Sequence, residues 1–282
     1  MIDLILAVLS STMVALVMRI SGRYTDKNRN ISMLAVNYLI CTLLACLYSG
    51  FGSVFTPAEG SGIALGLGSV NGLLYLLGFV LLQINTKRNG VVMSSTFIRL
   101  GVLVPTISSI VIFHEKPTVM QILGIVLALA AIIGISTDDG KNKSTLDFKA
   151  GLILMLLAGG TADAMSKVYD EYGKPELSNQ FLVYTFIFAL LFCVALMLYK
   201  KQTLGKPELL FGAIIAIPNY YSARFLLKAV ASVPAVVAYP TYSVSTIVVT
   251  SLVGVLFFHE KINRRQGIAI AGILVALVLL NI

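Results

Sequence analysis

The sequence predicts an all-α integral membrane protein with ten transmembrane helices, arranged as two inverted five-helix repeats. Charged residues make up only 12% of the chain, whereas a soluble domain carries about 25%. Apolar runs close to the length that crosses a bilayer recur from one end of the chain to the other. A short motif occurs twice at a fixed offset, and the charge bias of the loops reverses between the two halves.

The apolar runs are separated by turn-forming and polar residues, which set the expected ends of the helices. Breakers include Gly50, Pro57, the pair Asn89-Gly90, and Pro117. The expected spans are 2–20, 31–49, 61–83, 90–112 and 118–136 in the first half, and 149–168, 179–199, 207–228, 234–257 and 264–281 in the second.

An internal repeat supports the division into halves. The sequence FHEK at 113–116 returns at 258–261, and at the same offset of 145 residues Gln121 matches Gln266. We therefore expect an N-terminal five-helix repeat at 1–136, a cytoplasmic linker at 137–148 and a C-terminal five-helix repeat at 149–282.

The basic residues give the expected orientation. Loops of the first half hold four, none, two and one Lys or Arg, and the equivalent loops of the second half hold one, three, none and three. Every pair reverses its bias, as inverted repeats require. The positive-inside rule then places both termini outside a plasma-membrane protein. Residues 1–18 contain Asp3 and no basic residue, so we expect a retained first helix rather than a cleaved signal peptide.

Composition also limits the chemistry. The net charge of +8 comes from loop residues and is assigned to membrane orientation, not to nucleic-acid binding. Cys41, Cys46 and Cys193 lie in apolar runs, and His114 and His259 lie in turns without a second ligand nearby. We expect no metal site and no cofactor, and no phosphate-binding loop sequence occurs.

Ten helices, two five-helix halves and an HEK turn before the last helix of each half resemble the drug/metabolite transporter superfamily, in particular its ten-helix EamA-type branch. The resemblance covers the whole chain, with Glu115 and Glu260 in equivalent turns. It implies transport of small metabolites by alternating access, through a cavity lined by helices 1, 3 and 4 and their repeat mates. Familiar members have cytoplasmic termini, whereas the charges here indicate the reverse.

Ionisable residues inside the apolar segments are candidates for function, because a charge in hydrocarbon costs several kcal/mol. Arg99 and Arg224 offer the paired donors that bind a carboxylate or phosphate. Asp163 suits a substrate amine or a coupling proton. The structural alternatives are an internal salt bridge or snorkelling for Arg99, snorkelling at the outer interface for Arg224, and a pair with Lys167 for Asp163.

Polar and aromatic residues on the same expected helices complete the candidate substrate site. The alternative for each is hydrogen bonding or packing between helices. These residues are Asn71, Tyr75, Asn219, Tyr220, Tyr239 and Tyr242.

Two features have a structural interpretation. Glu115 and Glu260 precede helices whose N-termini favour a carboxylate, and a gating role is the alternative. The glycine pairs 62 and 66, and 68 and 72, predict faces where helices pack closely.

The predicted function is secondary active transport of a small polar metabolite, with an amino acid or another carboxylate as the expected substrate. The alternatives are an exporter of cationic or amphipathic compounds, a receptor or scaffold, and a membrane enzyme acting on lipid-linked substrates. The expected partners are a small-molecule substrate, the lipid bilayer and a coupling proton or ion. We expect a monomer.

Overall fold

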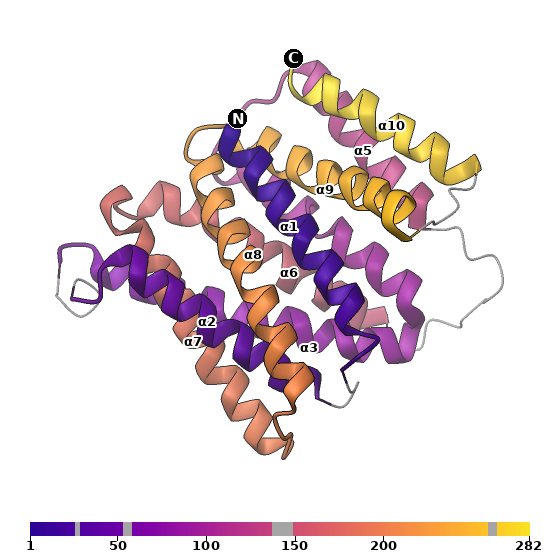
Figure 1. Cartoon of the computed structure of the whole chain (residues 1–282). Helices are drawn as coiled ribbons and strands as arrows, with labels where there is room; N and C mark the ends of the chain where they lie inside the picture. Colours follow the sequence, from indigo (N-terminus) through magenta and orange to yellow (C-terminus); the bar gives the residue numbers. More distant parts are fainter. Residues whose placement is uncertain (26–28, 53–57, 137–148, 259–263) are drawn as a thin grey trace. The chain divides into compact units, whose positions relative to one another are not determined.

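The computed structural model describes residues 1–25, 29–52, 58–136, 149–258 and 264–282. All regular structure in these ranges is helical (Figure 1). The expected linker at 137–148, together with His259 and Glu260, lies outside the described residues.

The helices follow the apolar runs of the sequence. The first half contains α1 (Ile2–Ser21), α2 (Asn30–Ser49), α3 (Ser61–Leu100), α4 (Leu103–Val111) and α5 (Val119–Ser136). The second half contains α6 (Lys149–Tyr172), a short 3₁₀ turn (Pro175–Leu177), α7 (Ser178–Tyr199), α8 (Lys206–Val230), α9 (Ala235–Phe258) and α10 (Arg264–Leu280).

The expected break at Asn89-Gly90 is wrong, because α3 continues through it to Leu100. The asparagines of this segment bond along and across helices instead of ending one. The Asn85 amide donates to the carbonyls of Leu81 (2.8 Å) and Gly151 (2.9 Å), and the Asn89 amide donates to Asn85 Oδ1 (2.9 Å). α3 ends at Leu100, and a two-residue turn at Gly101 and Val102 separates it from α4.

Seven helical segments among the described residues are long and apolar enough to cross a bilayer. They begin at Ile2, Asn30, Ser61, Ala150, Pro175, Lys206 and Ala235. Shorter apolar stretches cover Phe97–Val111, Val119–Gly134 and Gly267–Leu280. Large apolar side chains lie exposed along these helices, for example Ile5, Leu9 and Met13 of α1, which suits a surface in contact with lipid rather than water.

The chain forms two compact units, and each takes helices from both sequence halves. Unit 1 comprises Leu77–Ala164 and Ala229–Ile282, together with Met1. Unit 2 comprises Ile2–Leu76 and Met165–Lys228. The helices α3 and α6 therefore contribute to both units.

In unit 1, α5 and α10 lie side by side (Figure 1), and α9 contacts α4, α5 and α10. Leu280 of α10 is buried with Val236 and Val237 of α9, and Ile125 of α5 packs against this cluster. A second cluster joins α3 and α6 through residues that include Leu81 and Met155.

In unit 2, α2 and α7 form an extensive contact, and α3 packs on α7 through Gly68 and Gly72. A Cβ atom added at Gly72 would lie 2.6 Å from the Thr185 carbonyl oxygen and 2.7 Å from the Ala189 nitrogen. This glycine pair therefore provides the expected close-packing face. Gly62 and Gly66 have nothing within 4 Å of an added Cβ, so the expectation for that pair is wrong.

Candidate functional site

The nine predicted site residues fall into two groups, one in each compact unit. Arg99, Asp163, Tyr239 and Tyr242 belong to unit 1, and Asn71, Tyr75, Asn219, Tyr220 and Arg224 belong to unit 2. Each group is described within its own unit.

Arg224 lies in a cluster of aromatic side chains in unit 2. Its guanidinium carbon is 3.8 Å from the centre of the Tyr48 ring, and its Nη1 donates to the Tyr220 hydroxyl at 2.9 Å. Among the described residues no carboxylate lies within ion-pair distance of this guanidinium. The side chain is thus held by ring stacking and one neutral hydrogen bond, which leave its remaining donors available for an anion.

The rings around Arg224 support one another. Tyr48 stacks on Tyr220 at 5.7 Å between centroids, and its hydroxyl lies 2.7 Å from the Tyr221 hydroxyl. The Tyr48 backbone carbonyl accepts from the Asn179 amide at 3.3 Å. Tyr220 is fully buried, whereas 44% of Tyr48 is exposed, so the cluster has a buried inner side and an accessible outer side.

The buried side of this cluster continues towards Tyr75. The Phe186 ring lies 6.0 Å from Tyr220 and 6.3 Å from Tyr75. Asn71, one helical turn before Tyr75, is 2% exposed, and its Oδ1 has no hydrogen-bond partner among the described residues. An unsatisfied buried acceptor costs about 1–3 kcal/mol, so Asn71 is suited to a donor supplied by a ligand or by water.

Asn219 forms hydrogen bonds between helices. Its amide donates to Asn37 Oδ1 at 3.3 Å and lies 3.8 Å from Cys41 Sγ. The Cys41 thiol donates in turn to the Ala216 carbonyl at 3.3 Å. Asn219 therefore joins α8 to α2 inside unit 2.

In unit 1, Arg99 lies in the last turn of α3, not nine residues into a fourth helix. This difference follows from the continuation of α3 through Asn89-Gly90. The Arg99 side chain is partly buried, and in the described part of the chain it has no ion-pair partner. The salt-bridge alternative for Arg99 is therefore not observed in the described residues.

Asp163 and Tyr239 meet where α6 and α9 contact each other. The Tyr239 hydroxyl donates to the backbone carbonyl of Asp163 at 2.9 Å. No described residue forms an ion pair with the Asp163 carboxylate. The expected alternative, a pair with Lys167, is absent, because Lys167 binds Asp170 (3.2 Å) and Glu171 (3.6 Å) one turn further along α6.

Tyr242 follows Tyr239 on α9 and is partly exposed. Its backbone carbonyl accepts a hydrogen bond from the Thr246 hydroxyl at 2.8 Å.

Glu115 binds the N-terminus of α9, a helix far away in the sequence. Its carboxylate accepts hydrogen bonds from the backbone N–H groups of Ala235 (3.0 Å) and Val236 (2.7 Å), at the start of α9. The start of α5 has its own cap, in which Thr118 and Gln121 exchange side-chain and backbone hydrogen bonds at 3.0 and 3.2 Å. This arrangement is a capping box, and the helix N-terminus that the Glu115 carboxylate contacts within hydrogen-bond distance is that of α9.

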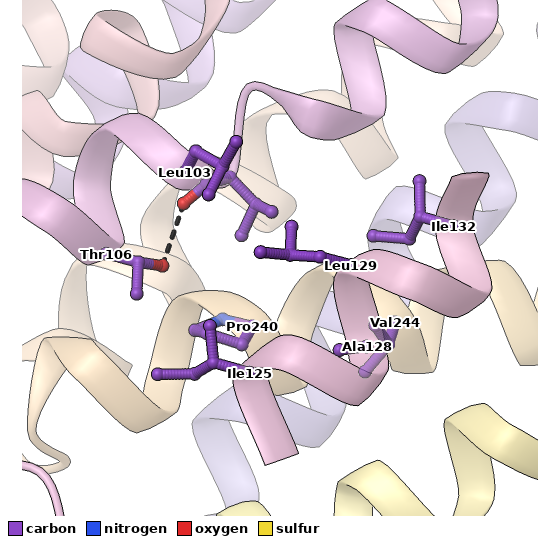
Figure 2. Close-up of a pocket in the computed structure, with 9 residues that line it drawn as sticks. Leu103, Thr106, Ile125, Ala128, Leu129, Ile132, Pro240 and Val244 are labelled. Atoms are coloured by element: carbon purple, nitrogen blue, oxygen red, sulfur yellow. Dashed lines mark hydrogen bonds between the residues drawn. The ribbon is translucent and has the colours of Figure 1, made fainter. Parts of the chain in front are cut away.

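Unit 1 also contains a small apolar pocket between α4, α5 and α9 (Figure 2). It holds about 10 Å³, enough for one water molecule at most. Pro240 and Val244 line it from α9, Leu103 from α4 and Ile125 from α5. The hydroxyl of Thr106, which also lines it, donates to the Val102 carbonyl at 2.8 Å. None of the predicted site residues lines this pocket, and its size excludes a metabolite.

The sequence missed one residue on which these arrangements depend, Tyr48, and the partner of another, Glu115. Tyr48 stacks on a guanidinium that is far away in sequence, and the only local signal was an aromatic residue at the end of an apolar run. Glu115 was recognised by its repeat, but its partner lies about half the chain away. Within the described residues no group of three or more His, Cys, Asp or Glu side chains is placed to hold a metal ion.

Long apolar helices with exposed apolar side chains, and the ionisable side chains of Arg99, Asp163 and Arg224 within them, indicate a multi-pass membrane protein. The EamA-like transporter family model matches residues 1–137 and again residues 149–282. The chain belongs to the EamA-like transporter family.

Other comparisons agree in length and fold. A protein of Haemophilus influenzae (strain ATCC 51907 / DSM 11121 / KW20 / Rd), described as uncharacterized, is 26% identical over 281 residues, which cover 95% of this chain and 93% of that protein. A crystal structure superposes with a TM-score of 0.76 at 14% identity, over 99% of this chain and 95% of the other. At that identity the superposition demonstrates a shared fold alone.

Proposed function

We propose that this protein is a secondary active transporter of a small polar metabolite carrying a carboxylate, with an amino acid as the first class to test. The observation that carries the proposal is the state of Arg224. Its guanidinium is oriented by Tyr48 and Tyr220 and has no acidic partner in the described residues. A guanidinium in apolar surroundings gains most from a bidentate anion.

Asn71, which lies in the same unit as Arg224, suits the other end of such a substrate. Asn71 offers a buried acceptor without a donor, and Asp163 offers a carboxylate without a cationic partner in the described residues. Asn71 can accept a hydrogen bond from the substrate's ammonium, and Asp163, in unit 1, can carry a coupling proton. Arg99 supplies a second cation in unit 1.

We further propose ten membrane spans in two inverted repeats, working by alternating access with both termini outside. The reversal of loop charge between the halves supports the inversion. At about 1.5 Å per residue, α3 is roughly twice as long as the hydrocarbon layer, so it holds enough residues for one span and part of another. In this proposal the part of α3 after Asn89, together with α4, forms the fourth span. Reporter fusions at each terminus test the orientation, and a cytoplasmic C-terminus would reverse it.

The first experiment is a thermal-shift screen of the purified protein in detergent. The panel contains amino acids, dicarboxylates, phosphorylated metabolites, nucleosides, sugars and organic cations. A ligand present at 100 times its dissociation constant stabilises the folded state by about 2.7 kcal/mol. Stabilisation by carboxylates that disappears in Arg224→Gln and persists in Lys228→Gln supports the proposal, because Lys228 is an exposed cation one turn away on the same helix.

The screen also separates the alternatives. Stabilisation by organic cations alone, sensitive to Asp163→Asn and insensitive to Arg224→Gln, would identify an exporter of cationic compounds and reject the carboxylate proposal. Flux of the stabilising compound into sealed proteoliposomes distinguishes a transporter from a receptor or an enzyme. Loss of accumulation on adding an uncoupler would identify a proton as the coupling ion.

A further inference from the structure

A proline separates the first turn of α9 from the rest of this helix. Pro240 lies inside α9, and a proline has no N–H to donate to the carbonyl four residues earlier, that of Val236. The first turn, Ala235 to Tyr239, is therefore connected to the rest of α9 by a weakened segment. The pocket of Figure 2 lies beside this segment, with Pro240 in its wall.

Glu115 accepts hydrogen bonds from the N-terminus of this turn. A helix begins with four N–H groups that have no partner inside the helix. In α9, the N–H groups of Val237 and Ala238 bond to the Pro234 carbonyl at 3.0 and 2.9 Å. Those of Ala235 and Val236 bond to the two carboxylate oxygens of Glu115. Because Pro234 has no N–H and Ala238 makes a regular i→i−4 bond, only the N–H groups of 235–237 lack an i→i−4 partner, and Glu115 satisfies two of these three.

The turn that carries Glu115 is itself fixed. His114 has a φ of 55°, a left-handed conformation that costs a non-glycine residue about 1–3 kcal/mol. The Glu115 N–H returns to the Ser109 carbonyl at 3.0 Å, which ties the turn to the end of α4. Thr118 and Gln121 form the cap of α5, and this strained turn presents the Glu115 carboxylate to α9.

Tyr239 connects this turn to the candidate site. It lies one helical turn after Ala235, and its hydroxyl bonds to the Asp163 carbonyl. We propose that Glu115 is a positioning residue. Its two hydrogen bonds, which we call the latch, fix the first turn of α9 and so keep the Tyr239 hydroxyl bonded to the Asp163 carbonyl of α6. Any effect of Glu115 on substrate or proton binding at Asp163 rests on the proposed function, but the latch itself does not.

Hydrogen–deuterium exchange of the full-length protein in lipid nanodiscs tests the latch without a substrate. In Glu115→Ala, we expect the amides of 235–239 to exchange about tenfold faster, as loss of an N-cap allows. The amides of α5 and α10 should exchange as in the unchanged protein. Glu115→Asp, which keeps the carboxylate, should show a smaller increase.

Two matched variants separate a latch from a general loss of stability. Gln121→Ala removes the cap of α5 and should speed exchange at the start of α5 alone. Pro240→Ala restores the missing N–H, and in the Glu115→Ala background it should reverse most of the increase at 235–239. A merely destabilising substitution at Glu115 would not be rescued at this one turn.

The proposal is overturned if folded Glu115→Ala exchanges at 235–239 as the unchanged protein does. It is also overturned if exchange rises equally in all helices and Pro240→Ala gives no local rescue. Should Glu115→Ala fail to fold, Glu115→Gln takes its place with the same criteria. Neither result depends on the ligand screen, so failure of the latch and failure of the proposed function remain distinguishable.

Discussion

Substituting Gly72 by alanine tests whether α3 and α7 are packed as closely as the structure shows. The added Cβ would lie 2.6 Å from the Thr185 carbonyl oxygen, 2.7 Å from the Ala189 nitrogen and 2.9 Å from the Phe188 Cβ. Two of these atoms belong to the α7 backbone, so a rotamer change cannot relieve the overlap. The helices must separate, or α3 must shift along α7.

The expected magnitude follows from two opposing effects. Overpacking a well-packed contact costs about 1–3 kcal/mol, and backbone neighbours place Gly72→Ala at the upper end. Alanine is favoured over glycine within a helix by about 1 kcal/mol. We therefore expect a net loss of about 1–2 kcal/mol in the free energy of unfolding for Gly72→Ala.

Gly66→Ala is the matched control, because it lies on the same helix and nothing is within 4 Å of its added Cβ. It keeps the gain in helix propensity without the overlap, so it should be neutral or stabilising. The two variants should differ by roughly 1–3 kcal/mol. At about 2–4 °C per kcal/mol, Gly72→Ala should unfold several degrees below Gly66→Ala.

The chain suggests its own assay. It contains no tryptophan, but Cys41 and Cys193 are free and buried, so a thiol-reactive fluorogenic maleimide reports their exposure on heating. Equal unfolding temperatures for Gly72→Ala and Gly66→Ala would refute the close approach of α3 and α7. A lower temperature for Gly66→Ala than for Gly72→Ala would refute it equally.

Three further substitutions have defined outcomes. Asn85→Leu removes the amide that bonds Gly151 across two helices and should lower stability by about 1–2 kcal/mol in the same thermal assay; no change would refute that contact. Tyr239→Phe removes only the hydroxyl that binds the Asp163 carbonyl and should cost about 1 kcal/mol, whereas a stabilised variant would contradict the bond. Gln121→Ala breaks the capping box of α5 and should lower stability by about 0.5–1 kcal/mol, while exchange at the start of α9 stays unchanged.

The sequence by itself determined the helical membrane class and most helix positions. Apolar runs of about 20 residues have few stable alternatives in a bilayer, because each backbone polar group must be satisfied within its own helix. The internal repeat was recognisable from the FHEK motif, which occurs once in each half. The family model likewise matches each half. Candidate charged residues were visible because a charge within an apolar run is rare for energetic reasons.

Local signals failed where partners were distant. Asn89-Gly90 predicted a break, but Asn85 bonds to Gly151 of α6 and Asn89 bonds back to Asn85. These bonds satisfy the amides inside a continuous helix. Gly62 and Gly68 looked alike in sequence, and only the neighbouring α7 makes the second one a close contact.

Only the tertiary structure decided which residues work together. Arg224 meets Tyr48, and Glu115 meets the first turn of α9, across long separations in sequence that no local pattern encodes. The physical reason is that a lone guanidinium or carboxylate in apolar surroundings takes whichever ring or backbone donor the fold brings within reach. Sequence identifies the groups that need a partner, and the packing of the helices supplies it.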